Sequence, residues 1–267
     1  MSDERVIRNR LALLPPIRRA RLWRLYAESG RRFLDFWMDG GRSILGAKGT
    51  GIGTAAKAAV DTGLTRPFPS VREARLEKAL LERYPGYAAV RLFGNEERAR
   101  AAARSAFPEG EPAMLRPFSE HLRDKEEIGA APAEPRTAMP MLPCPIALAP
   151  GALLFKDRVD AESIQGDIVP PLSLSCARRA LIEMDRFAET YDESLWKKVD
   201  GRLRPFFDRS GPYLYPRVGN EAYEGIFVAA LGAGVLLSPD HDQPSIIPGD
   251  FDDGELARLA EALKEMK

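Results

Sequence analysis

One stretch, residues 65–104, constrains the fold more than any other, because it alternates secondary-structure signals over a short distance. Its first half has apolar residues at every third or fourth position, which predicts an amphipathic helix over residues 70–84. Ser70 is a suitable N-cap, and Glu73 completes a capping box. Pro85 and Gly86 then end this helix.

The second half of the stretch predicts a buried strand that turns into another helix. Residues 88–93, AAVRLF, form a short apolar run, and Gly94 and Asn95 follow as a turn. Glu96 and Glu97 fall in the first turn of the next helix, where acidic side chains are favourable. A strand that leads through a glycine turn into a helix is typical of α/β proteins and often holds an anionic group.

The same stretch resembles the class III (fold type I) pyridoxal-phosphate-dependent aminotransferases and aminomutases. The residues that match their pattern are Phe68-Pro69-Ser70, Glu73, Leu76, Leu80, Pro85-Gly86, Val90-Arg91-Leu92, Glu97 and 101–104. The resemblance implies that Gly94 and Asn95 stand in the turn that binds the cofactor phosphate. The family has Ser-Gly-Thr or Ser-Gly-Ser there, whereas this chain has Gly94-Asn95-Glu96 and is one residue shorter. A carboxylate at Glu96 would repel a partly buried phosphate by roughly a few kcal/mol.

Both ends of the chain resemble the small domain of that family. Residues 21–26 and 33–37 alternate polar and apolar positions around a turn, which predicts a β-hairpin. Near the other end, residues 223–231, 235–239 and 252–263 indicate a helix, a strand and a last amphipathic helix. We therefore expect an α/β chain of reduced fold-type-I architecture, in which the hairpin packs with the strand at 235–237 in an α+β small domain formed from both chain ends.

The middle of the chain is short and rich in proline. In the family it carries an aromatic residue that stacks on the cofactor ring, an Asp for the pyridine nitrogen and the Schiff-base Lys, and none has a recognisable position here. We expect three parts: 1–104 with the hairpin and entry helices, 105–166 as a reduced remnant of the large domain, and 167–267 as the C-terminal region. In the family, a strand follows the Schiff-base lysine. The residues before the corresponding segment of this chain, 136–144, contain no Lys.

Lys156 is the one candidate for a Schiff-base lysine in a rearranged site. It follows the apolar run 152–155 at the end of an expected strand. The alternative interpretation is a surface lysine beside Asp157 and Arg158. Schiff-base chemistry needs this amine beside a phosphate cradle, so Lys156 would have to fold close to Gly94 and Asn95.

A glycine-rich segment, residues 46–54, is a second candidate for contact with an anion. Lys48, Gly49, Thr50 and Gly51 precede a predicted helix and could offer a charge and backbone N–H groups to the cofactor phosphate. The spacing matches neither a P-loop nor a complete dinucleotide fingerprint, so a plain connecting loop is the alternative.

Composition limits the classes of function. Lys plus Arg and Asp plus Glu number 39 each, which gives no reason to expect nucleic acid or an acidic membrane as a partner. The charged N-terminus and the absence of a long apolar run indicate a cytoplasmic protein. Cys144 and Cys176 are interpreted as buried free thiols, and His121 and His241 as solvated side chains, so no metal site is expected.

We therefore predict an aminotransferase-like protein that has lost pyridoxal-phosphate chemistry, needs no cofactor and binds a small molecule or a partner. The partner is expected to be a second copy or another aminotransferase-like chain, with Trp23, Trp37, Phe68 and Tyr84 as contributors of apolar surface. The alternative is an active, pyridoxal-phosphate-dependent transaminase or aminomutase that uses Lys156.

Overall fold

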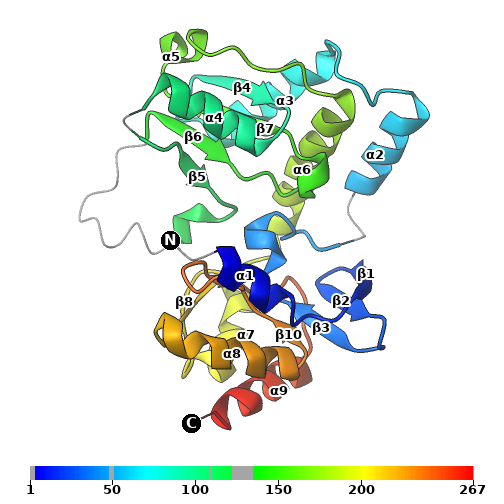
Figure 1. Ribbon diagram of the computed structural model, residues 1–267. Coiled ribbons are helices and arrows are strands. Elements are labelled where there is room, and N and C mark those ends of the chain that lie inside the picture. The colour runs from blue at the N-terminus through cyan, green and yellow to red at the C-terminus, as the bar shows by residue number, and fades with distance from the viewer. Residues whose placement is uncertain (1–3, 48–50, 109, 122–134, 267) are drawn as a thin grey trace. The chain divides into compact units, whose positions relative to one another are not determined.

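A computed structural model describes residues 4–47, 51–108, 110–121 and 135–266 (Figure 1). The chain is a mixed α/β protein that divides into two compact units. Unit 1 comprises residues 1–49, 120–123 and 187–267, and unit 2 comprises residues 50–119 and 124–186. Both units therefore draw on more than one of the three parts 1–104, 105–166 and 167–267.

Unit 1 contains a sheet in the order β1-β2-β3-β10. Its strands are β1 (Ile17–Arg21), β2 (Arg24–Ala27), β3 (Arg32–Asp35) and β10 (Val235–Leu236). The expected hairpin is present, with Gly30 at φ +84° in its turn. β3 pairs in parallel with β10, and Leu34 lies opposite Val235, so the N-terminal hairpin and the C-terminal strand share one sheet as expected.

A second sheet of unit 1 has the order β11-β9-β8. Its strands are β8 (Phe207–Ser210), β9 (Tyr213–Pro216) and β11 (Ser245–Ile246). Ile246 donates its N–H to the carbonyl of Phe36 at 2.6 Å, which ties this sheet to the segment after β3. The helices are α1 (Glu4–Leu11), α7 (Glu193–Leu203), α8 (Asn220–Gly232) and α9 (Asp253–Lys264).

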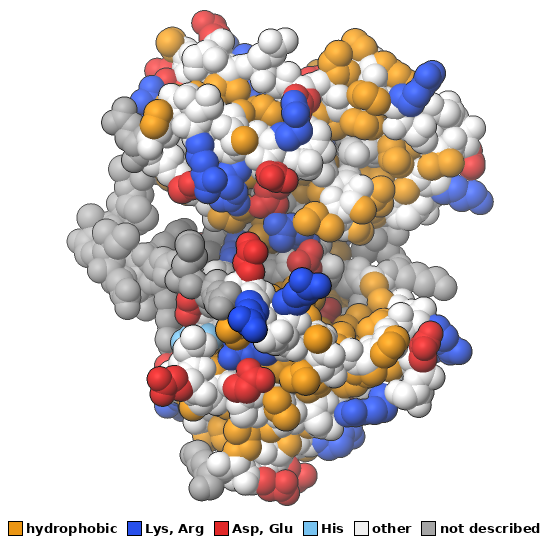
Figure 2. All heavy atoms as spheres, in the orientation of Figure 1, with side chains coloured by type: hydrophobic (Ala, Val, Ile, Leu, Met, Phe, Trp, Pro, Cys, Tyr) orange, Lys and Arg blue, Asp and Glu red, His pale blue; other side chains and the backbone are white. Residues whose placement is uncertain are grey.

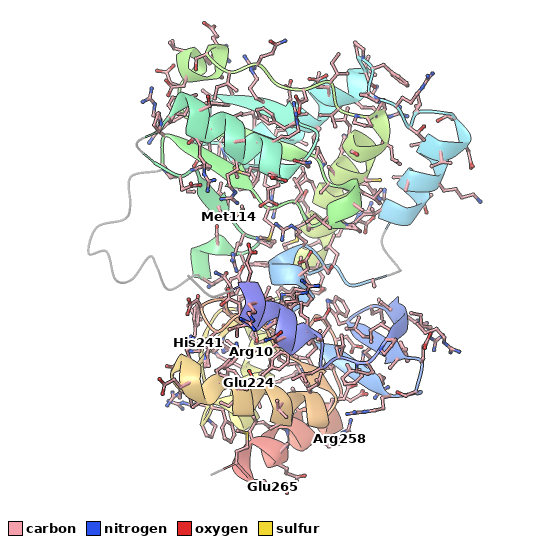
Figure 3. All side chains as sticks on the ribbon, viewed as in Figure 1. Arg10, Met114, Glu224, His241, Arg258 and Glu265 are labelled. Atoms are coloured by element: carbon pink, nitrogen blue, oxygen red, sulfur yellow. The ribbon has the colours of Figure 1, made fainter. Side chains whose placement is uncertain are left out.

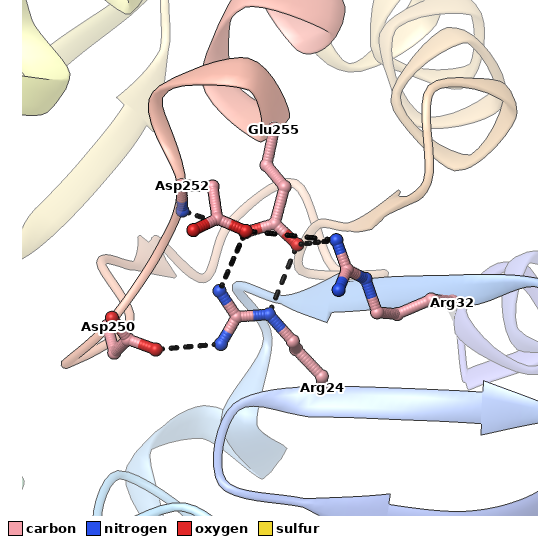
Figure 4. Close-up of polar contacts among 5 residues, drawn as sticks. All are labelled: Arg24, Arg32, Asp250, Asp252 and Glu255. Atoms are coloured by element: carbon pink, nitrogen blue, oxygen red, sulfur yellow. Dashed lines mark hydrogen bonds and ion pairs between the residues drawn. The ribbon is translucent and has the colours of Figure 1, made fainter.

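Buried arginines fasten the ends of unit 1 together. Arg10 of α1, 3% exposed, donates to Glu224 of α8 at 2.7 Å and to the carbonyl of Pro239 at 2.9 Å (Figure 3). Arg24 of β2 donates to Glu255 of α9 at 3.1 and 2.8 Å and to Asp250 at 2.8 Å (Figure 4). Each ion pair joins residues more than 200 positions apart in the sequence.

Unit 2 is built on a sheet in the order β4-β7-β6-β5. The strands are β4 (Ala89–Phe93), β5 (Ala113–Leu115), β6 (Thr137–Pro140) and β7 (Gly151–Phe155). β7 runs antiparallel to both β4 and β6, whereas β5 and β6 are parallel. The helices are α2 (Ile52–Asp61), α3 (Val71–Arg83), α4 (Glu96–Ala106), α5 (Arg158–Glu162) and α6 (Pro171–Ala188).

The predicted helix–strand–helix at residues 70–104 is confirmed as α3, β4 and α4. Ser70 caps α3, although its hydroxyl accepts from the N–H of Arg72 at 3.3 Å and not from Glu73. Small residues of α4, Ala99 and Ala103, pack on Leu153 and Phe155 of β7 in the core. Their short side chains let the helix lie close to the sheet, which fixes the position of its N-terminus.

The proline-rich middle of the chain contributes strands to unit 2, and Thr137 begins β6. Trp23, expected on an apolar surface, is 9% exposed and stacks on Phe187 inside unit 1. None of the described helices combines the length and the hydropathy needed to span a bilayer.

Candidate functional site

The turn after β4 and the start of β7 meet at one edge of the unit 2 sheet. Phe93, the last residue of β4, lies opposite Gly151, the first of β7. Gly151 touches the turn so closely that an added Cβ would lie 2.1 Å from the carbonyl oxygen of Asn95. Only glycine fits there, so the Gly94-Asn95 turn is pressed against the sheet.

The N-terminus of α4 already holds a carboxylate of the chain itself. The side chain of Asn95 caps the helix by accepting from the N–H of Arg98 at 2.9 Å. Gly94 donates its N–H to Asp167 at 2.9 Å, and Arg98 donates through Nε and a terminal nitrogen to the two oxygens of the same carboxylate at 2.5 Å each. Asp167 thus takes the place at the helix N-terminus that suits a bound anion.

Backbone and charge both hold Asp167 there. Its own N–H donates to the carbonyl of Leu92 at 2.8 Å, which lays the segment before α6 along the end of β4. The hydrogen bond from Arg98, followed by that from Gly94, lowers the pKa of Asp167 despite partial burial. The carboxylate is therefore charged at neutral pH and competes with any external anion.

Glu96, expected to repel a phosphate, is half-buried in the first turn of α4. Its carboxylate lies 3.4 Å from Arg100, one helical turn further on. The same arginine also lies 3.5 Å from Glu111. Glu96 is thus engaged along the helix flank.

Lys156 lies at the opposite edge of the sheet from the Gly94-Asn95 turn. It follows Phe155, which the antiparallel register places opposite Ala89 at the start of β4. It lies five positions after Gly151, a length of roughly 16 Å along an extended strand. The backbone N–H of Lys156 donates to the carbonyl of Arg136 at 3.0 Å. The alternative function required Lys156 to lie close to Gly94 and Asn95. The fold does not bring these residues together.

Three of the four residues of the glycine-rich candidate, Lys48, Gly49 and Thr50, lie outside the described residues. Gly51 precedes α2, and the guanidinium of Arg179 from α6 packs on it: an added Cβ would lie 2.0 Å from Nε. Arg179 also pairs with Glu183 at 2.5 Å. An arginine thus covers the start of α2.

A groove between α3 and α6 was not predicted from the sequence. It has a volume of about 370 Å³ and a floor that includes Ala79, Leu181 and Ile182. The ion pair of Arg83 and Asp185, at 2.5 Å, lies on its rim. The 3.6-residue periodicity of both helices could have indicated apolar faces, but the sequence does not say which two helices lie side by side.

The cysteine and histidine interpretations can be compared with the structure. Cys144 and Cys176 are buried and free, as expected. Burial, with a further contribution from Cys176, raises the pKa of Cys144 to about 12. His241 is partly enclosed, with its ring nitrogens 3.1 Å from Asp242 and 3.0 Å from the carbonyl of Val218. The described residues contain no cluster of His, Cys, Asp or Glu suited to a metal ion.

Solved structures match this fold over nearly the whole chain. They include an ornithine aminotransferase from Plasmodium yoelii (TM-score 0.67, 15% identity, 100% of both chains). An omega-transaminase from Sphaerobacter thermophilus matches with a TM-score of 0.66 and 13% identity, over 98% of this chain and 97% of that chain. For N-acetylornithine aminotransferase from Stenotrophomonas maltophilia the TM-score is 0.62 and the identity 16%, over 94% and 95%. The chain has an aminotransferase fold.

Sequence comparison adds relatives without adding an activity. An uncharacterized protein of Treponema pallidum is 28% identical over 274 residues, which is 87% of this chain and 88% of that protein. An uncharacterized protein of Borreliella burgdorferi is 27% identical over 94% of this chain and 92% of its own length. No family model matches the sequence.

The described residues at this edge of the unit 2 sheet do not fit pyridoxal phosphate. Gly94 and Arg98, the groups that could hold a phosphate, already bind Asp167. The described residues that directly follow β4, β5 and β6 at this edge, 94–95, 116–118 and 141–150, contain no lysine. Lys156, the candidate for the Schiff base, lies at the other edge.

Proposed function

We propose that this chain is a non-catalytic aminotransferase-like protein that acts by binding another molecule and forms no internal aldimine. The observation that supports this most directly is the carboxylate of Asp167 on the N–H of Gly94 and the guanidinium of Arg98. A phosphate at the same place would have to displace a charged, hydrogen-bonded side chain. The cofactor would therefore lose much of the anchor that a helix N-terminus offers it.

The chemistry of the lysine supports the same proposal. An aldimine needs an amine within bonding reach of an aldehyde whose phosphate is held in place. Here the Gly94 turn and Lys156 lie at opposite ends of β7. No single position of the cofactor can satisfy both, so an active transaminase that uses Lys156 is disfavoured.

One surface of unit 2 could serve a binding role. In unit 2, the α3–α6 groove offers an apolar floor with charged groups around it, which suits a small amphipathic molecule. Arg178 on its rim has no ion pair with another described residue, so an acidic group on such a molecule would find a free cation there. A second copy of the chain is the other expected partner.

Equilibrium dialysis with pyridoxal phosphate tests the proposal, with Asp167→Ala as the informative variant. We expect no saturable one-to-one binding to the native chain and a measurable gain for Asp167→Ala, because the variant frees Gly94 and Arg98. Asp160→Ala is the matched control, since Asp160 accepts two hydrogen bonds from Arg136 at 2.6 Å on α5. Saturable one-to-one binding to the native chain, together with turnover of an amino donor, would overturn the proposal.

A further inference from the structure

The groove between α3 and α6 has an apolar floor, and charged side chains lie around it. Leu181 of α6, on the floor, is 5% exposed, and α3 contributes Ala79, whose short side chain leaves the groove open. The residues of α6 that line the groove recur every three or four positions, so they share one face of the helix. They are Arg178, Leu181, Ile182 and Asp185.

α6 meets a different neighbour on another face. Arg179 packs on Gly51, just before α2, and pairs with Glu183 at 2.5 Å. Figure 2 shows apolar and charged side chains together over α2 and α6 on the visible face of unit 2. Arg178 is exposed and lines the α3–α6 groove. The two adjacent arginines therefore belong to different surfaces of the helix.

Three of the four charged residues that line the groove already have partners. Arg83 of α3 pairs with Asp185 of α6 at 2.5 Å, and Glu82 lies 3.7 Å from Lys78 on α3. Arg178 forms no ion pair or side-chain hydrogen bond with another described residue. The charge that the groove leaves without compensation is therefore positive, and a ligand that complements it carries a negative group.

The order of the residues along α6 sets the length and the polarity of such a ligand. Arg178 precedes Asp185 by seven positions, so the unpaired guanidinium and the ion pair of Asp185 lie roughly 10 Å apart along the helix axis. Leu181 and Ile182 lie between them and can cover an apolar chain. One guanidinium matches one carboxylate, because the two groups form parallel hydrogen bonds.

We propose that the α3–α6 groove binds an amphipathic monocarboxylate with a medium-length apolar tail, whose carboxylate pairs with Arg178 and whose tail lies on Leu181 and Ile182. This inference rests on the proposed binding function and names the class of molecule that is bound. A phosphate monoester would bring a second negative charge, and the described residues that line the groove offer no second unpaired cation. An amine would be repelled by Arg178.

Isothermal titration of the full chain with octanoate tests the ligand class, and octylamine and octanol are the comparison probes. We expect one-to-one binding of octanoate with a submillimolar Kd, and binding of the other two weaker by about tenfold or more. Arg178→Glu should reverse this preference, so that octylamine binds better than octanoate. Arg202→Glu is the matched control, since Arg202 is an exposed arginine of α7 without an ion pair to a described residue.

A second variant fills the groove without changing its charge. Ala79 is half-buried, and phenylalanine there would occupy the space above Leu181 and Ile182. Ala79→Phe should lower the affinity for octanoate by about tenfold or more, and urea unfolding shows whether the variant is folded. Arg178→Glu changes an exposed position, so it decides the question even if the larger side chain at position 79 is not tolerated.

Two kinds of result would overturn this inference. If octanoate does not bind the native chain saturably, the ligand class is wrong. If Arg178→Glu keeps the preference for octanoate, or a folded Ala79→Phe variant binds it at full strength, the groove is not the site. Neither result bears on catalysis, because pyridoxal phosphate and Asp167→Ala test the loss of the aldimine separately. Octanoate should bind Asp167→Ala as it binds the native chain.

Discussion

The carboxylate of Asp167 accepts two hydrogen bonds from the guanidinium of Arg98, both at 2.5 Å, in front of the first turn of α4. The two residues are 69 positions apart in the sequence. The resemblance to aminotransferases implies that this turn binds the cofactor phosphate. The chain therefore supplies its own anion to a place where the resemblance implies a ligand.

Acid should weaken the contact between Asp167 and Arg98 and so lower the stability of the native chain. Replacing Asp167 should remove this part of the pH dependence. The pKa of Asp167 is lowered in the folded state, so its contribution to the free energy of unfolding is present above the ordinary aspartate pKa of about 3.9. It is lost as the pH falls through the lower, folded-state value. Asp167→Asn should lose less stability than the native chain between pH 5 and acid, measured by urea unfolding at about four pH values. If the free energies of unfolding of the native chain and of Asp167→Asn fall in parallel as the pH is lowered, the ion pair does not stabilise the fold.

Arg24 should be among the most sensitive charged positions of unit 1. It is 8% exposed and binds Glu255, which is 4% exposed. Removing one partner of a buried pair leaves the other without compensation, so Arg24→Ala should lower the free energy of unfolding by about 3 kcal/mol. Arg32, 3.0 Å from Glu255, limits the loss (Figure 4).

An exposed ion pair of the same unit is the control for Arg24. Arg217 pairs with Asp208 at 2.5 Å, and the two side chains are 46% and 37% exposed. Arg217→Ala should cost less than about 1 kcal/mol in the same urea experiment. Equal losses for the two arginines would contradict the role assigned to burial.

Asp35 should make the stability fall as the pH rises through the mildly acidic range. Burial raises its pKa to about 6, against the hydrogen bonds from the N–H groups of Met38 and Trp37. Between the ordinary aspartate pKa of about 3.9 and the folded-state pKa of about 6, the folded state therefore binds more protons than the unfolded state. The stability that comes from protonated Asp35 is lost as the pH rises through this range. Asparagine does not titrate, so Asp35→Asn should be relatively more stable at pH 7 than at pH 4, by about 2 kcal/mol. A pH-independent difference would contradict the raised pKa.

Cys144 should be inert in the folded protein. Its pKa is raised to about 12, chiefly by burial, and that of Cys176 is raised by burial as well. Because the thiolate is the reactive form, neither thiol should react with a thiol reagent at pH 8 until denaturant is added. Rapid labelling of either cysteine in the native chain, located by mass spectrometry, would be the contrary result.

Local sequence patterns predicted the elements of the fold better than they predicted the site. The periodicity of residues 70–84 and the apolar run before Gly94 led directly to α3 and β4. Matching patterns at both chain ends also predicted that the N-terminal hairpin packs with the strand at 235–237, and β3 pairs with β10. These signals are local, or are carried by the hydrophobic period.

The site depends on register and on contacts between distant residues, which periodicity does not encode. Only the folded chain shows Asp167 bound to Gly94 and Arg98. The sequence placed Lys156 at the end of a strand. The antiparallel pairing of β4 and β7 determines that this end lies away from the Gly94 turn. Nothing in the sequence indicates that the charged residues at positions 98 and 167 form an ion pair.

Reductive trapping with pyridoxal phosphate tests the absence of an internal aldimine most directly. The purified chain is mixed with pyridoxal phosphate, its absorbance is recorded, borohydride is added, and modified peptides are mapped by mass spectrometry. We predict no protein-bound aldimine band and only scattered, substoichiometric modification of surface lysines, unchanged in Lys156→Ala. A stoichiometric adduct on one lysine, with an aldimine band that Lys156→Ala abolishes, would contradict the account and establish a working pyridoxal-phosphate site.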